Sequence, residues 1–430
     1  MLDSLSGGVR ALRCLDTLRR ESVLDADSLK RLQDALLARL AKSAAKTGFY
    51  RHLSPPSGGS NSNQPPTSGG MPVDLESFPI TEREDVRLGP DGFFACDETR
   101  HHLTSMTSGS SGTPVEVRSD REATAWRNAL SIASLLDAGV KPMSLCARIH
   151  RKESAPGRIR MHYFFRMLGL SLFDDERANL TVIRKSGPQS LICCSSYAQF
   201  MAKENDYAEK PVKFKQVICG SEVTGENARR EISRSFSCPV FDVYGCHEFG
   251  HMAWECPEEH SMHVSSRFII EIVDGRGRPA RNGPGEVLVT ALHNHAMPLI
   301  RYRIGDRASW GKECPCGRGL PVIASIEGRT NEVFALPGGG IRPAACFSNI
   351  ESLNGRVKSF QLIQEREDLF VLRFVPCGKG LDDSVRGDVE SIVRKACGGA
   401  RILVEFEEAQ RIPREENGKF RKFYSKVGKG

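Results

Sequence analysis

Apolar residues recur every three or four positions between residues 25 and 50, which places them on one face of a helix. The apolar positions of this predicted amphipathic helix are Leu29, Leu32, Leu36, Leu37, Leu40 and Ala44. The next stretch, residues 54–70, reads SPPSGGSNSNQPPTSGG. Its side chains have too little to bury to offset the entropy lost on ordering, so we expect a flexible surface loop.

Short β-type runs alternate with helical stretches from about residue 71 to residue 325. The clearest examples are a strand at 212–220, a helix at 227–236 and a strand at 239–245. Such alternation is typical of α/β layers built on a substantially parallel sheet. Runs at 267–274 and 285–292 flank a turn-rich segment and predict a hairpin in a β-rich subdomain.

The last hundred residues predict a separate, small α+β unit. Its strands are expected at 357–364, 368–376 and 400–409, and its helix at 382–398. The pattern changes near residues 328–332. The sequence therefore predicts an α/β protein with a large domain, residues 1–330, and a small domain, residues 331–430.

The composition narrows the class of protein. The chain has 430 residues, of which 40% are hydrophobic and 26% charged, and a formal charge of +7 that is scattered among acids. This is typical of a globular protein and argues against a dedicated nucleic-acid binder. No run reaches the ~20 apolar residues of a membrane span, and the first residues lack the apolar core of a secretory signal. We therefore expect a cytoplasmic protein whose fourteen cysteines are reduced thiols or metal ligands.

A loop rich in hydroxyls and glycines is the sharpest local signal. Backbone N–H groups of such a loop can converge on a phosphate, while hydroxyls add donors and glycines allow close approach. The loop lacks the Gly-Lys-Ser/Thr of a Walker A motif, and alone it could be a mere turn. Its residues are Thr107, Ser108, Gly109, Ser110, Ser111, Gly112 and Thr113.

Further motifs follow the loop in a fixed order, and two of them come directly after predicted strands. The carboxyl ends of strands are where open α/β sheets bind ligands. The motifs are Cys219-Gly220-Ser221-Glu222, Val243-Tyr244-Gly245-Cys246-His247-Glu248, the run from Pro298 to Asp306, Gly328-Arg329-Thr330-Asn331, and the run from Ile412 to Lys419.

This order and spacing resemble the acyl-adenylate-forming (AMP-binding) superfamily, in particular its phenylacetate–CoA ligase branch. The resemblance implies a multi-subdomain N-terminal adenylate-forming domain and a mobile C-terminal α+β cap. It also implies ATP-dependent activation of a carboxylic acid, aryl or arylacetic, to an acyl-AMP with release of pyrophosphate, followed by transfer to CoA.

The resemblance also implies roles for individual residues. Residues 107–113 would surround the β- and γ-phosphates, Glu248 would hold Mg²⁺, and Lys419 would bridge the substrate carboxylate and the α-phosphate. The remaining ATP contacts would come from Gly220, Ser221, Glu222, Tyr244 and Gly245 around the adenine, and from Asp306 and Arg329 around the ribose. Taken singly, Glu248 could be a surface acid, Tyr244 a core aromatic and Lys419 one exposed lysine of a basic tail.

Two positions depart from the family pattern. Thr113 stands where the phosphate loop commonly has Lys, and Asn331 stands at the hinge, which commonly carries an acid or Lys. Backbone donors do most of the cradling and hinge residues chiefly absorb dihedral change, so the proposed chemistry survives both. They weaken the claim for CoA as acceptor.

Three cysteines and a histidine predict a structural Zn²⁺ site in the region 256–316. Cys256, Cys314 and Cys316 would supply sulfur ligands, and the spacing favours His263 over His260 as the fourth ligand. Some members of the resembled branch carry both segments. The alternative is that these are buried thiols without a metal.

Other readings of function remain open. The acyl group could pass to an amine or a carrier protein, or the chain could bind nucleotide without turnover. The substrate pocket is expected from residues 125–165 and 220–250, but no contact can be named, and a homodimer is left open. His293 and His295 are expected at the surface.

Overall fold

The computed structural model describes most of the chain. The described residues are 2–52, 73–95, 103–106, 115–150, 157–280, 283–329, 333–339, 341–343, 346–347, 350, 356–377, 380–414 and 420–427. They form two compact units, and each unit is built from two stretches of chain. The first unit is Met1–Val140 with Phe241–Ile326, and the second is Lys141–Val240 with Glu327–Gly430.

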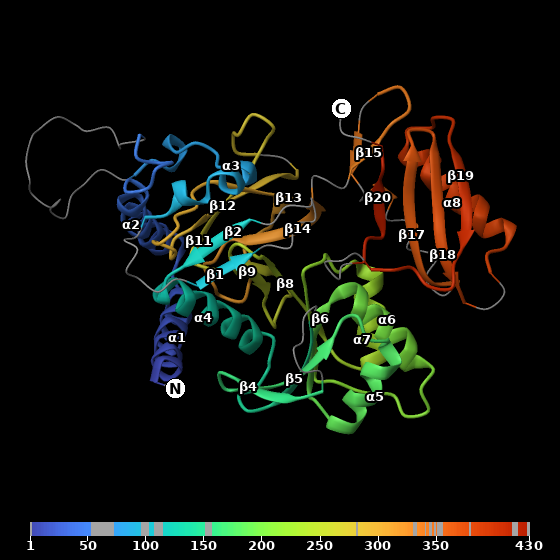
Figure 1. Ribbon diagram of the computed structural model, residues 1–430, viewed down its shortest axis with the longest axis horizontal. Coiled ribbons are helices and arrows are strands. Elements are labelled where there is room, and N and C mark those ends of the chain that lie inside the picture. The colour runs from blue at the N-terminus through green and yellow to red at the C-terminus, as the bar shows by residue number, and fades with distance from the viewer. Residues whose placement is uncertain are drawn as a thin grey trace, which may run out of the picture. The chain divides into compact units, whose positions relative to one another are not determined.

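The first unit combines four α-helices with a largely antiparallel sheet (Figure 1). Its sheet runs in the order β11-β12-β13-β14-β10-β9-β8, and a separate hairpin pairs β1 with β2. The helices are α1 (Leu2–Glu21), α2 (Ala26–Ala44), α3 (Arg83–Leu88) and α4 (Arg121–Asp137). The strands are β1 (Leu103–Met106), β2 (Glu116–Ser119), β8 (Val240–Cys246), β9 (Gly250–Glu255), β10 (Met262–Val264), β11 (Phe268–Val273), β12 (Gly285–Ala291), β13 (Tyr302–Trp310) and β14 (Val322–Arg329).

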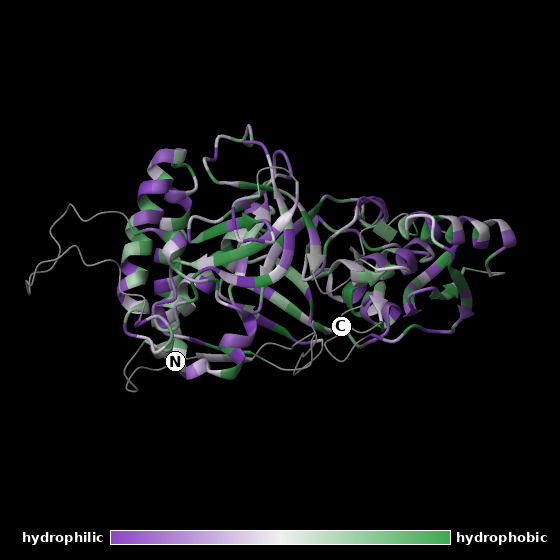
Figure 2. Ribbon diagram, turned by 90° about the horizontal axis from the view of Figure 1, so that it is seen from above, coloured by the Kyte–Doolittle hydropathy of each residue, from purple (hydrophilic) through white to green (hydrophobic). Residues whose placement is uncertain are grey.

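The predicted amphipathic helix is confirmed as α2. Asp25 caps its N-terminus by accepting a hydrogen bond from the Ser28 backbone N–H at 2.7 Å. Leu29, Leu36 and Leu40 are among its buried positions, as the period requires. Hydrophilic and hydrophobic residues accordingly alternate along the helices in Figure 2. The loop at 54–70 lies outside the described residues.

The second unit contains the parallel sheet that the α/β alternation predicts. Its order is β7-β6-β3-β5-β4, with parallel pairs β7/β6, β6/β3 and β3/β5. The strands are β3 (Leu145–His150), β4 (Ile159–His162), β5 (Phe165–Ser171), β6 (Ser190–Cys194) and β7 (Gln216–Gly220). The helices α5 (Glu176–Ser186), α6 (Ser195–Asp206) and α7 (Glu226–Phe236) share a core with it that includes Leu191, Tyr197, Met201, Val217 and Phe236.

The C-terminal part of the second unit is a four-stranded sheet in the order β19-β18-β17-β20, packed with one helix. All three strands and the helix expected here are confirmed. The elements are β17 (Val357–Arg366), β18 (Leu369–Pro376), α8 (Asp383–Ala396), β19 (Leu403–Glu408) and β20 (Phe423–Ser425), preceded by the pair β15 (Val333–Ala335) and β16 (Ile341–Pro343). Phe360, Phe370 and Phe374 form its core with Val389 and Val393 of α8.

The prediction that His293 lies at the surface is wrong. The β-rich part of the first unit encloses its side chain, and this burial lowers the pKa of His293 to about 3. The hairpin predicted at 267–274 and 285–292 is confirmed as β11 and β12, which pair antiparallel with Ile270 opposite Val289. No helix in the part of the chain that the structure describes is long and apolar enough to cross a membrane.

Candidate active site

A tight hairpin between β8 and β9 presents Glu248. Cys246 pairs with Gly250 across a three-residue turn, His247–Phe249. Gly250 takes a φ of +74°, a left-handed conformation that suits glycine at the end of such a turn. A Cβ at Gly245 would lie 2.1 Å from the Gly250 carbonyl oxygen, so this strand can pass its partner only as glycine. The two glycines of the Tyr-Gly-Cys-His-Glu-Phe-Gly run thus fix where the carboxylate of Glu248 lies.

Glu248 is buried and partnered by two groups from distant segments. Its Oε1 accepts a hydrogen bond from Arg83 Nη1 at 2.8 Å and one from the Tyr302 hydroxyl at 3.3 Å. Burial and the charge of Glu248 raise the pKa of Tyr302, which therefore stays a neutral donor. Both hydrogen bonds end on Oε1. A carboxylate is one of the oxygen ligands that Mg²⁺ prefers.

Arg127 of α4 approaches the same turn. Its Nη2 donates to the His247 carbonyl oxygen at 2.8 Å, and burial lowers the pKa of its guanidinium. Burial also raises the pKa of Cys246 far above its usual value, so this thiol adds no charge beside Glu248. A small cavity adjoins Arg127, Glu248 and the buried His293. Glu248 therefore lies near two arginines, Arg83 and Arg127.

Tyr244 and Asp306 meet across the first unit. The Tyr244 hydroxyl donates to Oδ2 of Asp306 at 2.9 Å, although the two residues are 62 positions apart in the sequence. Tyr244 lies in β8 and Asp306 lies in the middle of β13. Because the hydroxyl orients the carboxylate, this pair presents an aromatic ring and a fixed acceptor together. The ring suits a nucleotide base, and the acceptor suits a ribose hydroxyl.

The predicted adenine loop, Gly220–Glu222, lies in the second unit at the end of β7. Ser221 adopts a left-handed φ of +69°, which turns the chain sharply there. Oε2 of Glu222 accepts a hydrogen bond from the Ser196 backbone N–H at 2.8 Å, at the N-terminus of α6. Oε1 of Glu222 is buried and has no hydrogen-bond partner among the described residues. No sequence pattern predicted that Glu222 bonds to the N-terminus of this helix.

Several predicted site residues fall outside this description. Residues 107–113, Asn331 and Lys419 lie outside the described residues. Arg329 ends β14, but its side chain is not described. The structure therefore brings together Glu248 with Arg83 and Tyr302, and Tyr244 with Asp306.

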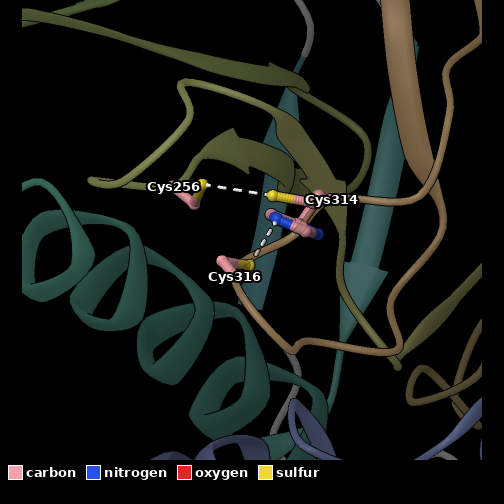
Figure 3. A group of neighbouring side chains, drawn as sticks. Cys256, Cys314 and Cys316 are labelled. Atoms are coloured by element: carbon pink, nitrogen blue, oxygen red, sulfur yellow. Dashed lines mark hydrogen bonds between the residues drawn. The ribbon is translucent and has the colours of Figure 1, made fainter.

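The four predicted zinc ligands converge in the first unit (Figure 3). Cys256 directly follows β9, His263 lies in β10, and Cys314 and Cys316 lie between β13 and β14. Their ligand atoms all lie within 4.8 Å of one another. His260 turns elsewhere, with its Nδ1 3.3 Å from Oε2 of Glu255.

Two distances test whether this cluster fits a metal ion. Tetrahedral Zn²⁺ with bonds of ~2.3 Å to sulfur and ~2.0–2.1 Å to nitrogen requires S–S edges of ~3.8 Å and S–N edges of ~3.6 Å. Sγ of Cys256 and Sγ of Cys314 are 3.8 Å apart, and Sγ of Cys316 is 3.4 Å from Nε2 of His263. Both values fit a closed tetrahedral Cys₃His site. The residues supply no open coordination position, so the site suits a structural metal.

Comparison with known proteins agrees with this architecture. The chain is 28% identical over 373 residues to a phenylacetate–coenzyme A ligase of Thermus thermophilus, covering 82% of this chain and 80% of that protein. It is 26% identical over 287 residues to the enzyme of the same name from Pseudomonas putida, covering 63% and 64%. No family model matches the chain.

Solved structures share the fold over most of the chain. A 2-hydroxyisobutyryl-CoA ligase in its postadenylation state superposes with a TM-score of 0.72 at 18% identity, covering 95% of this chain and 92% of that chain. An anthranilate CoA ligase bound to anthranoyl-AMP superposes with a TM-score of 0.54 over 74% of this chain. The chain thus has the fold of the acyl-adenylate-forming acid–CoA ligases, and over most of its length its sequence is similar to that of phenylacetate–coenzyme A ligases.

Proposed function

We propose that this protein is an acid–CoA ligase, which activates a carboxylic acid with ATP and then transfers the acyl group to CoA. In the first step a carboxylate oxygen of the acid bonds to the α-phosphorus, and pyrophosphate leaves. In the second step the sulfur of CoA attacks the acyl carbon, AMP leaves, and the thiol proton is released. The observation that carries the proposal is the hydrogen-bonded pair of Tyr244 and Asp306, which lies in the same unit as the buried, Arg83-paired Glu248.

The chain's own residues would do the following work. Tyr244 and Asp306, with the loop Gly220–Glu222, would hold the adenosine, and Arg329 would lie near the ribose. The hydroxyl-rich loop 107–113 would hold the β- and γ-phosphates. Lys419 would bring the substrate carboxylate and the α-phosphate together, since both are anionic and need a cation between them. Mg²⁺ held at Glu248 would neutralise charge on the phosphates.

The similarity to phenylacetate–coenzyme A ligases favours an aryl or arylacetic acid as substrate. We also propose that residues 331–430 move as a cap on residues 1–330 and that Asn331 is the hinge. None of the described cysteines forms a disulfide, which supports a reducing, cytoplasmic setting.

We further propose that Cys256, His263, Cys314 and Cys316 bind a structural Zn²⁺. The two edge lengths of the cluster support this assignment. The metal would tie the β13–β14 connection to β9 and β10, and would take no part in the reaction.

An acid-screened pyrophosphate assay tests the function. Incubation with ATP, Mg²⁺ and a panel of carboxylic acids should release pyrophosphate with at least one aryl or arylacetic acid. Lys419→Ala should lower this rate by roughly 10²- to 10³-fold, because it removes a cation from the transition state. Lys426→Ala is the matched control: this lysine of the same tail pairs with Glu365 at 2.7 Å on the surface, and its loss should not change the rate.

Mass analysis after addition of CoA identifies the acceptor. An acyl-CoA product supports the proposal. Pyrophosphate release without a thioester from any acid would show an enzyme that serves an amine or a carrier protein. No pyrophosphate from any acid in the panel would indicate a nucleotide-binding protein without turnover.

A further inference from the structure

Arg414 is buried where the C-terminal segment meets helix α6, within the second unit. Its side chain is 7% exposed. Its guanidinium carbon lies 4.9 Å from the ring centroid of Tyr197, 5.4 Å from that of Phe200 and 6.0 Å from that of Phe420. Nη1 donates to the Ser196 hydroxyl oxygen at 3.4 Å. Guanidinium–ring contacts of this kind are stronger when they are desolvated than when they are exposed.

The pocket that receives Arg414 is rigid. The Tyr197 hydroxyl donates to the Asp174 carbonyl oxygen at 2.9 Å and accepts from Nδ2 of Asn179 at 2.6 Å, which fixes its ring. Glu176 lies 3.9 Å from Nη2 of Arg414, and burial raises the pKa of this carboxyl group. A planar cation that stacks on rings and bonds at its edge fits this pocket, and an ammonium group does not offer the same shape.

Phe420, the residue after Lys419, is a second anchor of the C-terminal segment on α6. It is buried, and its ring meets that of Phe200 edge to face at 5.1 Å between centroids. Arg414 and Phe420 flank residues 415–419 in the sequence, and both contact Phe200. The two residues that flank the segment 415–419, Arg414 and Phe420, are therefore both held at one point on α6.

The anchors follow one face of α6. Ser196, Phe200 and Lys203 are three or four residues apart and so lie on the same side of the helix. Nζ of Lys203 donates to the carbonyl oxygens of Val357 and Lys358, at 3.3 Å and 2.9 Å. Nζ of Lys422 reaches Oε1 of Gln199 at 3.4 Å. A cleft of about 460 Å³ adjoins these contacts, so a few anchors, and not a continuous core, hold the C-terminal part here.

Ser196 joins this contact to the predicted adenine loop. Its hydroxyl oxygen accepts from Arg414, while its backbone N–H donates to Glu222. One residue at the start of α6 therefore contacts both the C-terminal segment and the loop that the proposed function assigns to the nucleotide.

We propose that Arg414 is a positioning residue for the adenylation half-reaction: seated among Tyr197, Phe200 and Phe420, it holds the C-terminal segment on α6 so that Lys419 is presented for that step. The inference rests on the proposed function. Under the proposed function Lys419 acts on the acid and the α-phosphate in the first half-reaction, so we expect Arg414 to serve that half-reaction and not the second.

The test measures the two half-reactions separately in Arg414→Ala and Arg414→Lys. Pyrophosphate release at saturating acid should fall roughly 10- to 100-fold in Arg414→Ala and by less in Arg414→Lys, which keeps the charge but not the planar group. Thioester formation from supplied acyl-AMP and CoA should stay within about twofold of wild type. Arg411→Ala, an exposed arginine three residues earlier that lines the same cleft, should leave both rates unchanged.

Hydrogen exchange provides a readout that does not depend on turnover. Arg414→Ala should raise exchange at the backbone amides of β20 and of α6, and Arg411→Ala should not. Equal loss of both half-reactions, an unchanged adenylation rate, or unchanged exchange would overturn the proposal. If Arg414→Ala does not fold, Phe200→Leu removes one shared ring and must show the same split. A wild-type protein that activates no acid would overturn the proposed function, while the exchange data would still decide whether Arg414 anchors the segment.

Discussion

The proposed reaction centre of the first unit and the proposed C-terminal anchor of the second unit hold charged groups in different ways. Glu248 is buried on a hairpin and neutralised by Arg83, and Asp306 is oriented by Tyr244, with hydrogen bonds of 2.8 and 2.9 Å. Arg414 is equally buried, but rings surround it, and its hydrogen bond to Ser196 is 3.4 Å long. In the first arrangement the hydrogen bonds are short, and each carboxylate has a polar partner. The second depends on several weaker contacts beside a cleft.

The difference follows from what each region has to do under the proposed function. Groups that stabilise charge in a transition state act best when they are fixed in advance, because no energy is then lost in reorienting them. A segment that serves only one of two half-reactions must leave its site again, so its contacts have to be individually weak. Loss of a partner in the first unit should therefore leave a buried charge unpaired. Loss of an anchor in the second unit should shift the equilibrium between the C-terminal segment bound on α6 and released from it.

Glu248→Gln should have the largest effect on catalysis. The amide keeps the volume but not the charge, so the proposed Mg²⁺ ligand is weakened and Arg83 loses its ionic partner. We expect acid-dependent pyrophosphate release to fall by roughly 10²- to 10³-fold, or about 3–4 kcal/mol of barrier.

Glu271→Gln is the control for this change. Glu271 is a partly buried acid of the same unit that pairs with Arg301 at 3.1 Å. Its loss should lower stability but keep the rate within about threefold. Equal loss of activity in the two variants would show that Glu248 has a structural role only.

Removal of one zinc ligand should have the next largest effect, and on stability. Cys314→Ser should lower the Zn²⁺ content of the purified protein and destabilise it by about 3 kcal/mol, which corresponds to roughly 6–12 °C in Tm for a unit of this size. Elemental analysis and thermal unfolding measure the two quantities.

Cys346→Ser is the matched control, because this cysteine is exposed and belongs to the second unit. It should change neither the metal content nor the Tm. A wild-type protein that contains no zinc and is insensitive to chelators would show that the four residues are simply buried neighbours.

The sequence predicted regular elements best where one face of an element is buried. The helix expected at 382–398 is α8, and the strand expected at 285–292 is β12. Helix α1 had no such signal, since Gly7 and Gly8 interrupt it and charges are spread along it. Its buried residues, such as Leu15 and Leu18, face inward because α1 packs against α4, a contact that local sequence does not show.

Motif order named Glu248, Tyr244 and Asp306 as candidates, but it did not show that Tyr244 bonds to Asp306 or that Arg83 bonds to Glu248. Arg83 lies 165 positions before Glu248, and no spacing rule connects them. The bond between Ser196 and Glu222 is similar, because it depends on two neighbouring parallel strands and the helix after one of them. Arg414 stood within a recognised motif, yet its pocket on α6 became visible only in three dimensions.

Tyr244→Phe tests the short pairing of the first unit with a smaller change. It removes only the hydroxyl that orients Asp306, and a hydrogen bond to a charged group is worth ~1.5–3 kcal/mol. We expect the KM for ATP to rise roughly tenfold or more, with a smaller change in kcat. Tyr207→Phe alters an exposed tyrosine and should leave both constants unchanged. A rise in KM that is the same in both variants would exclude a specific role for the Tyr244–Asp306 pair.

Lys203→Met should have the smallest effect, and it tests whether the anchors of the second unit are individually weak. Burial lowers the pKa of Lys203, which shows that its charge is held there at a cost, and its hydrogen bonds reach two neutral carbonyl oxygens. Methionine keeps the aliphatic stem, so the packing along α6 survives while both hydrogen bonds are lost. We expect the free energy of local opening to fall by about 1 kcal/mol, seen as a roughly fivefold rise in hydrogen exchange at the amides of β17.

The adenylation rate should change less than in Arg414→Ala, because Lys203 contacts β17 and not the segment next to Lys419. Lys210→Met, an exposed lysine beyond the same helix, is the control. A loss of adenylation in Lys203→Met as complete as in Glu248→Gln would show that the anchors of the second unit are not individually weak. The contrast with the firmly paired charges of the first unit would then be wrong.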